Sequence, residues 1–133
     1  MIANKPQTAM DRLAQALAET SGVAFAALIG SRADHTARES SDWDIAVCWE
    51  SGGDPFARLG QHEALRHRLA QCLEIQDEKI DLIDLSSARL AMKAVVAEEG
   101  TILHMKDELA WAYFQTSTWR ELEDYYWDRA HAA

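Results

Sequence analysis

Two apolar runs in the first half of the chain predict neighbouring β-strands. Residues 23–29 (VAFAALI) are apolar without interruption and end at Gly30, a pattern typical of a buried strand. Residues 42–50 (DWDIAVCWE) are rich in β-branched and aromatic residues, which favour a second strand. Because side chains alternate along a strand, Asp42 and Asp44 point to one face of it. The apolar residues that alternate with them occupy the opposite face.

Periodic apolar positions and capping signals predict four longer helices. Thr8 is the expected N-cap of the first helix, and Asp11 completes the cap. Asp54 and Pro55 cap and open the second helix, and Gly100 stops the third. The predicted helices span residues 8–19, 55 to about 72, 86 or 87 to about 98, and 107 to about 129, with a further short helix at residues 32–37.

Helices and strands alternate along the chain, with a third strand expected at residues 79–85 (KIDLIDL). This alternation predicts an α/β (α+β) fold, in which a small mixed β-sheet carries helices mainly on one face and a long C-terminal helix follows. A chain of 133 residues without internal repeats can form one domain with a modest core. Residues 1–133 are therefore expected to form a single domain.

Charge and composition exclude several classes of function. The formal net charge is −9, and Lys and Arg total only 13, so no direct nucleic-acid partner is expected, because phosphate contacts need clustered basic residues. No apolar run is long enough to span a bilayer, and the first ten residues lack a signal-peptide core. Cys48 and Cys72 lie far apart and predict neither a disulfide nor a zinc site. These features predict a cytoplasmic protein with no membrane partner.

Asp42 and Asp44 are the strongest candidates for chemistry. Carboxylates on alternate residues of a strand lie roughly 7 Å apart, a separation suited to holding divalent cations between them. A lone D-x-D more often marks a solvated strand end or a turn. Here, however, Gly30 and Ser31 precede the pair with ten residues between them, and they place a tight turn at the end of the preceding strand. The combination favours a metal site beside a phosphate-binding turn.

Gly30 and Ser31 have the chemistry needed to bind the phosphates of a nucleotide. Glycine permits a positive φ angle and a close approach of the backbone. Amides at the start of the following turn, together with the Ser31 hydroxyl, can donate hydrogen bonds to phosphate oxygens. Arg32 is a further nucleotide-binding candidate, with a solvated arginine as the alternative. On their own, Gly30 and Ser31 would indicate only a turn that ends a strand.

The spacing of Gly30 and Ser31 relative to Asp42 and Asp44 resembles the G-S-x10-D-x-D motif of the DNA polymerase β-like nucleotidyltransferase superfamily, and in particular its minimal nucleotidyltransferase (MNT) domains. The resemblance covers nearly the whole chain, including residues 90–104, which look like the helix and short strand found late in that family. It implies a polymerase β-like nucleotidyltransferase core.

The resemblance also implies a third acidic residue, two Mg²⁺ ions and ATP as the substrate. Asp81 is expected to be that residue rather than Asp84, because the acid of the family lies early in its strand and residues three apart face opposite ways. Asp42 and Asp44 would bridge the two metal ions. Asp81 would complete the metal site on the attacking side and would help to accept the proton of the acceptor.

MNT domains of this size are often encoded beside a HEPN-domain ribonuclease toxin. The resemblance therefore implies an antitoxin that transfers AMP from ATP to a tyrosine of its cognate HEPN toxin and forms a hetero-oligomer with it. The attached AMP would add bulk and negative charge beside the RNA-binding site of the toxin. The alternatives are a small-molecule nucleotidyltransferase, a non-enzymatic binding antitoxin and an acidic structural module.

Aromatic residues are concentrated in the predicted C-terminal helix. At 100° per residue, one apolar set falls within an arc of about 140° and is expected to pack in the core. A second set lies on nearly the opposite side and indicates contact with another chain, with a helix sandwiched inside its own fold as the alternative. The core set is Trp111, Phe114, Trp119, Leu122, Tyr125 and Tyr126, and the second set is Leu109, Tyr113 and Trp127.

Overall fold

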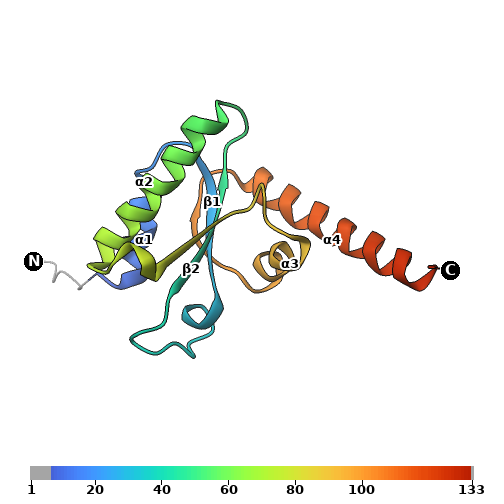
Figure 1. Cartoon of the computed structure of the whole chain (residues 1–133), viewed down its shortest axis with the longest axis horizontal. Helices are drawn as coiled ribbons and strands as arrows, with labels where there is room; N and C mark the ends of the chain where they lie inside the picture. Colours follow the sequence, from blue (N-terminus) through green and yellow to red (C-terminus); the bar gives the residue numbers. More distant parts are fainter. Residues whose placement is uncertain (1–6, 133) are drawn as a thin grey trace, which may run out of the picture.

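A four-stranded mixed sheet runs through the middle of the protein, with a pair of helices on each of its faces (Figure 1). The structure is a computed structural model that describes residues 7–132. The elements follow in the order α1 (Ala9–Ala18), β1 (Val23–Ile29), η1 (Gly30–Arg32), β2 (Trp43–Trp49), α2 (Pro55–Leu73), η2 (Asp77–Lys79), β3 (Ile80–Asp84), α3 (Leu90–Glu99), β4 (Thr101–Met105) and α4 (Glu108–Ala130), where η1 and η2 are short 3-10 helices.

Strands β1 and β2 form the centre of the sheet, which has the strand order β3-β2-β1-β4. β1 pairs antiparallel with β2 and β4. β2 and β3 run parallel, and helix α2 lies between them in the chain. All seven residues of β1 are buried, as the uninterrupted apolar run predicts. The predicted mixed sheet is confirmed, and so is the long C-terminal helix.

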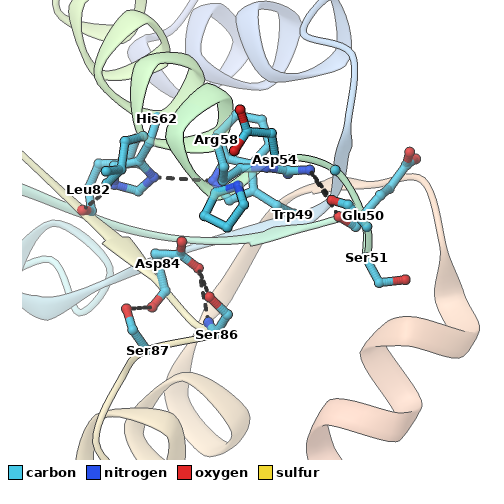
Figure 2. A pocket seen from close by; sticks show the side chains of 14 residues that line it. Trp49, Glu50, Ser51, Asp54, Arg58, His62, Leu82, Asp84, Ser86 and Ser87 are labelled. Carbon is cyan, nitrogen blue, oxygen red and sulfur yellow. Dashed lines mark hydrogen bonds between the residues drawn. The ribbon is translucent and has the colours of Figure 1, made fainter.

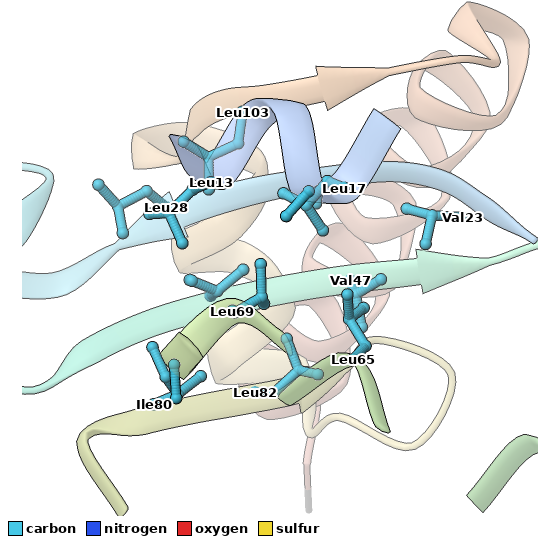
Figure 3. Packing of buried hydrophobic residues seen from close by; sticks show 14 of the residues in the cluster. Leu13, Leu17, Val23, Leu28, Val47, Leu65, Leu69, Ile80, Leu82 and Leu103 are labelled. Atoms are coloured by element: carbon cyan, nitrogen blue, oxygen red, sulfur yellow. The ribbon is translucent and has the colours of Figure 1, made fainter. Parts of the chain in front are cut away.

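Helices cover both faces of the sheet, so the prediction that they pack mainly on one face is wrong. On one face, Leu17 of α1 and Leu69 of α2 pack with Leu28 of β1 (Figure 3). On the other face, Phe25 of β1 packs with Trp111 of α4 and with residues of α3. Because β1 is apolar on both sides, a single helical layer would have left Phe25 exposed to water. We call these surfaces the α1/α2 face and the α3/α4 face.

Local hydrogen bonds explain where the helices begin. The Thr8 hydroxyl accepts from the Asp11 amide at 3.1 Å, and the Asp11 carboxylate accepts from the Thr8 amide at 3.2 Å, as predicted for the start of α1. Helix α3 begins at Leu90, later than predicted. The carboxylate of Asp84 accepts hydrogen bonds from the amide and the hydroxyl of Ser86, so this segment forms a separate turn instead of a helix cap.

Helix α4 packs on the sheet only with its first half. The rings of Trp111 and Phe114 lie against Phe25, with centroids 5.0 and 5.6 Å from it. The later turns run past the sheet and away from the rest of the protein (Figure 1). Three residues expected in the core are therefore exposed instead: Trp119 (42%), Tyr125 (46%) and Tyr126 (65%). The second set is exposed, as predicted: Leu109 (83%), Tyr113 (74%) and Trp127 (60%).

Cys48 and Cys72 are free, half-buried thiols, as their separation predicts. Burial is the main cause that raises the pKa of each thiol, so neither is activated as a nucleophile. Over residues 7–132, no helix combines the length and apolarity that crossing a membrane requires.

Candidate functional site

The parallel pairing of β2 and β3 places Asp44 directly beside Asp81. The neighbours of Asp81 in the strand, Ile80 and Leu82, belong to the core cluster on the α1/α2 face, together with Ile45 of β2. Because side chains alternate along both strands, Asp44 and Asp81 both point to the α3/α4 face. The two strands thus bring together two of the three predicted acidic residues.

Asp42 completes a group with Asp44 and Asp81, which we call the carboxylate cluster. The pKa of Asp44 is raised above its usual value, first by burial and then by the negative charges of Asp81 and Asp42. Within the described part of the chain, the one ion pair to this cluster joins Lys79 Nζ and Asp42 Oδ1 at 3.8 Å. Both of these side chains are about half exposed, so the pair offsets little of the repulsion. The cluster therefore concentrates negative charge that a bound cation would neutralise.

Lys79 was not expected at this site. It is the last residue of η2, immediately before β3 and two residues before Asp81. Its ammonium group also donates to the carbonyl of Ser40 at 3.3 Å, which links the start of β3 to the loop before β2.

Asp84 lies away from the carboxylate cluster. Its register position in β3 is opposite Val47, whose side chain belongs to the core cluster on the α1/α2 face. Its carboxylate accepts from the Ser86 hydroxyl at 2.8 Å (Figure 2). The alternation along β3 thus brings Asp81 and not Asp84 to the face of Asp44, which is the arrangement expected from the sequence.

Gly30 lies against the carboxylate of Asp44. Its φ angle is +75°, in the region that favours glycine. A Cβ atom at position 30 would collide with Asp44 Oδ2 and would lie 3.4 Å from Asp44 Cγ. The pairing of Ile29 with Asp44 across β1 and β2 produces this approach. Two parts of the sequence motif that are distant in the chain are therefore in contact, with Ser31 next to them.

Ser31 belongs to the 3-10 helix η1, which replaces the short helix predicted at residues 32–37. The carbonyl of Gly30 accepts from the amides of Ala33 and Asp34 at 3.0 and 3.2 Å, which closes the turn tightly. His35 then has a φ angle of +63°, so no regular helix continues through it.

Arg32 holds a loop instead of facing the carboxylate cluster. Its Nη2 atom donates to the carbonyls of Glu39 and Ser41 at 3.0 and 2.8 Å. Its guanidinium group lies 4.5 Å from the ring centroid of Trp43, which packs against the core cluster on the α1/α2 face. These contacts give Arg32 a structural role in the loop before β2, and its contact with phosphate stays a prediction.

Arg32→Met is expected to lower the free energy of unfolding by about 1–2 kcal/mol, because two hydrogen bonds from a charged group are lost. Urea unfolding followed by tryptophan fluorescence measures the change. Arg38→Met, at an exposed position in the same loop, is the control and should have little effect. An unchanged free energy of unfolding together with weaker ATP binding would instead indicate that Arg32 contacts phosphate directly.

A large cavity lies at the far end of β2 from the carboxylate cluster. It has a volume of about 790 Å³ and lies between Trp49, the start of α2 and the turn after β3 (Figure 2). Trp49 Nε1 donates to His62 Nδ1 at 3.2 Å, and His62 Nε2 donates to the carbonyl of Leu82 at 2.9 Å. His62 is thus fixed by structural hydrogen bonds. The carboxylate cluster is instead open to solvent, since the side chain of Asp42 is 56% exposed.

The carboxylate cluster has the donor chemistry for magnesium. Among residues 7–132, no group of three or more His, Cys, Asp or Glu side chains is arranged to hold a metal ion by itself. Mg²⁺ commonly binds through one or two carboxylates while keeping water and substrate phosphate oxygens as its other ligands. Asp42, Asp44 and Asp81 fit this mode because they offer crowded oxygen ligands beside an exposed glycine turn.

Metal-free Asp44→Asn protein is expected to have a higher melting temperature than metal-free wild type at pH 7. A carboxyl group with a raised pKa in the folded state contributes stability below its ordinary pKa of 3.8, and this contribution is lost as the pH rises through the raised value. Ionised Asp44 is therefore destabilising at neutral pH. Thermal unfolding in the presence of a chelator measures this effect. The difference in melting temperature between Asp44→Asn and wild type should become smaller as the pH is lowered towards 3.8. A variant that melts below wild type at pH 7 would contradict this account.

The topology, the Gly-Ser turn and the acidic residues on two adjacent strands together define a nucleotidyltransferase of the polymerase β type. The family described as polymerase beta nucleotidyltransferase matches residues 11–109, and the chain belongs to this family. A comparison with curated protein sequences gave no match.

Solved structures of toxin–antitoxin complexes share the fold. A chain from a toxin–antitoxin crystal structure with AMP-PNP is 24% identical, with 91% of this chain and 92% of that chain covered and a TM-score of 0.71. A chain from a mutant MntA-HpeT toxin–antitoxin complex is 21% identical, with the same coverage and a TM-score of 0.72. A chain from the complex of a tri-AMPylated Shewanella oneidensis HEPN toxin with an MNT antitoxin is 21% identical, with 92% and 90% covered and a TM-score of 0.66.

Proposed function

We propose that this chain is a magnesium-dependent adenylyltransferase that acts as an antitoxin and transfers AMP from ATP to a tyrosine of a cognate HEPN ribonuclease toxin. The observation that carries the proposal is the convergence of Asp42, Asp44 and Asp81 next to Gly30. The choice of ATP and of a HEPN toxin is supported by similar folds described with AMP-PNP and with an AMPylated HEPN toxin. Both substrates would meet the enzyme in the cytoplasm.

The residues of this chain have separate tasks in the proposed reaction. Amides of the turn at Gly30 and Ser31, with the Ser31 hydroxyl, hold the triphosphate. Asp42, Asp44 and Asp81 would hold Mg²⁺, which supplies charge neutralisation for the phosphates when it is bound. The carboxylate cluster thereby also orients the α-phosphate towards the acceptor.

Transfer forms a bond between the tyrosine oxygen and the α-phosphorus and breaks the bond from that phosphorus to the bridging oxygen of pyrophosphate. Asp81 accepts the proton of the tyrosine hydroxyl, and pyrophosphate leaves with the electron pair of the broken bond. Asp81 is suited to this role because it is exposed on the same face as Asp44, where a protein acceptor can reach it.

The small-molecule nucleotidyltransferase is the weaker alternative. Such an enzyme needs a pocket that encloses its acceptor. The carboxylate cluster lies at the start of β2 and β3, where the side chain of Asp42 is 56% exposed, and the cavity of about 790 Å³ is at the other end of β2. A large acceptor that supplies its own surface fits this arrangement better.

Mass spectrometry tests the proposal directly. The chain is mixed with ATP, Mg²⁺ and the HEPN-domain protein encoded beside it, and the masses of both proteins are measured. We expect increments of AMP on a tyrosine of the HEPN protein. Tight association without any increment would support a purely binding antitoxin, and the absence of both association and increment would contradict the proposal.

A further inference from the structure

Lys79 has two partners beside the carboxylate cluster. Its Nζ atom donates to the carbonyl of Ser40 at 3.3 Å and lies 3.8 Å from Asp42 Oδ1. The contact with Ser40 is a hydrogen bond to the backbone. The contact with Asp42 is longer than a hydrogen bond and joins two side chains that are each about half exposed, so this ion pair is weak. Lys79 therefore has one partner that anchors it and one partner that it can release.

The backbone just before Asp42 is held by cationic side chains. The carbonyls of residues 39–41 all accept hydrogen bonds from such side chains: Lys79 binds the carbonyl of Ser40, and Arg32 binds the carbonyls on either side of it. These bonds restrain the segment that carries the Asp42 carboxylate into β2. Because the bond to Ser40 does not depend on Asp42, Lys79 stays beside the carboxylate cluster when Asp42 turns to another cation.

The charge of Lys79 acts in opposite ways on the two ligands expected at the carboxylate cluster. The three carboxylates repel one another, since Asp81 and Asp42 both raise the pKa of Asp44. They attract a divalent cation and repel a triphosphate. Among residues 7–132, Lys79 is the one cationic side chain that forms an ion pair with them. Its charge therefore opposes the binding of a metal ion alone and favours the binding of ATP alone.

We propose that Lys79 is an exchangeable counter-charge for Asp42, an inference that rests on the proposed function. In the metal-free protein, Lys79 neutralises part of the charge of Asp42 and positions its carboxylate. Asp42 releases Lys79 when it turns to a cation, and Lys79, still anchored at Ser40, then offsets part of the charge of the triphosphate. The carboxylate cluster thereby favours a cation that comes with its nucleotide over a free cation. Lys79 is a positioning residue, because it acts through Asp42.

Lys79→Met tests the proposal by two binding measurements with effects of opposite sign. Mn²⁺, which takes the same oxygen ligands as Mg²⁺, is titrated without nucleotide and followed by electron paramagnetic resonance. ATP is titrated in the presence of a chelator and followed by calorimetry. Lys79→Met should bind Mn²⁺ about threefold more tightly and ATP about threefold more weakly than wild type, as expected for a partly exposed charge. A distorted site would weaken both affinities, so the opposite signs exclude a merely structural role.

Lys79→Arg and Lys106→Met are the matched controls. Lys79→Arg keeps the positive charge and should bind both ligands as wild type does. Lys106 has a similar exposure, 58% against 46% for Lys79, and pairs with Glu50, which follows β2 at the end away from the carboxylate cluster. Exposed charges at opposite ends of a strand are screened from each other by salt. Lys106→Met should therefore leave both affinities unchanged.

The inference is overturned if Lys79→Met changes neither affinity or changes both in the same direction, and also if Lys106→Met has the same effects. These failures differ from a failure of the proposed function. If Asp42→Asn and Asp44→Asn bind Mn²⁺ as wild type does, the carboxylate cluster is not the metal site and both proposals are wrong. If these two variants lose Mn²⁺ and wild-type protein transfers AMP while Lys79→Met binds both ligands as wild type does, only the role of Lys79 is wrong.

Discussion

Asp44→Asn is expected to lower the rate of AMP transfer by about a thousandfold or more while the fold stays intact. Asparagine keeps the size of the side chain but removes the charge that holds a cation, and preorganised charge is usually the largest contribution to catalysis. Asp44 is central in the carboxylate cluster, since its pKa responds to both Asp81 and Asp42. Incorporation of labelled AMP into the toxin measures the rate. Circular dichroism checks the fold.

Asp84→Asn is the matched control for this prediction. Asp84 lies in the same strand as Asp81, but its register partner Val47 belongs to the core cluster on the opposite face. Transfer by Asp84→Asn should therefore stay within a few-fold of wild type, whereas Asp81→Asn should lose most of its activity. If Asp44→Asn transferred AMP as fast as wild type, the carboxylate cluster would have no role in the reaction.

Gly30→Ala is expected to have the second largest effect, on both stability and activity. Alanine at a φ angle of +75° is strained by about 1–2 kcal/mol. Its Cβ atom would also collide with Asp44 Oδ2, so the carboxylate must move. A displacement of about 1 Å in a catalytic group can cost about a hundredfold in rate. We therefore expect a lower urea midpoint and a loss of AMP transfer of at least about tenfold.

Gly60→Ala separates these effects from the general consequences of replacing glycine. Gly60 lies within helix α2, and a Cβ atom there would meet nothing within 4 Å. This variant should gain about 0.5–1 kcal/mol of stability and should keep its activity. If Gly30→Ala unfolds and transfers AMP as wild type does, the contact between position 30 and Asp44 has no functional role.

Strand patterns predicted the geometry of the site well because it depends on local alternation. Alternation within β2 and β3 places Asp44 and Asp81 on one face. Asp42 immediately precedes β2, and its charge helps to raise the pKa of Asp44. The faces on which the helices pack were harder to predict, because they depend on contacts between residues that are far apart in the sequence. The apolar character of both faces of β1 was nonetheless a sign that helices would be needed on both sides.

Side chains in loops and at the end of α4 could not be placed from their spacing. Arg32 binds carbonyls of Glu39 and Ser41, and nothing in the local pattern selects that partner over phosphate. Helical periodicity identified the side of α4 that carries Tyr125. It could not show that the sheet ends before that residue and leaves it in solvent.

The exposure of the carboxylate cluster has a consequence for the length of the product. The side chain of Asp42 is more than half open to solvent. An acceptor that already carries one nucleotide could therefore present the end of that nucleotide without having to fit inside a chamber. Under the proposed function, the number of nucleotides added would be set by how long the two proteins remain together, and a longer-lived complex would leave a longer chain.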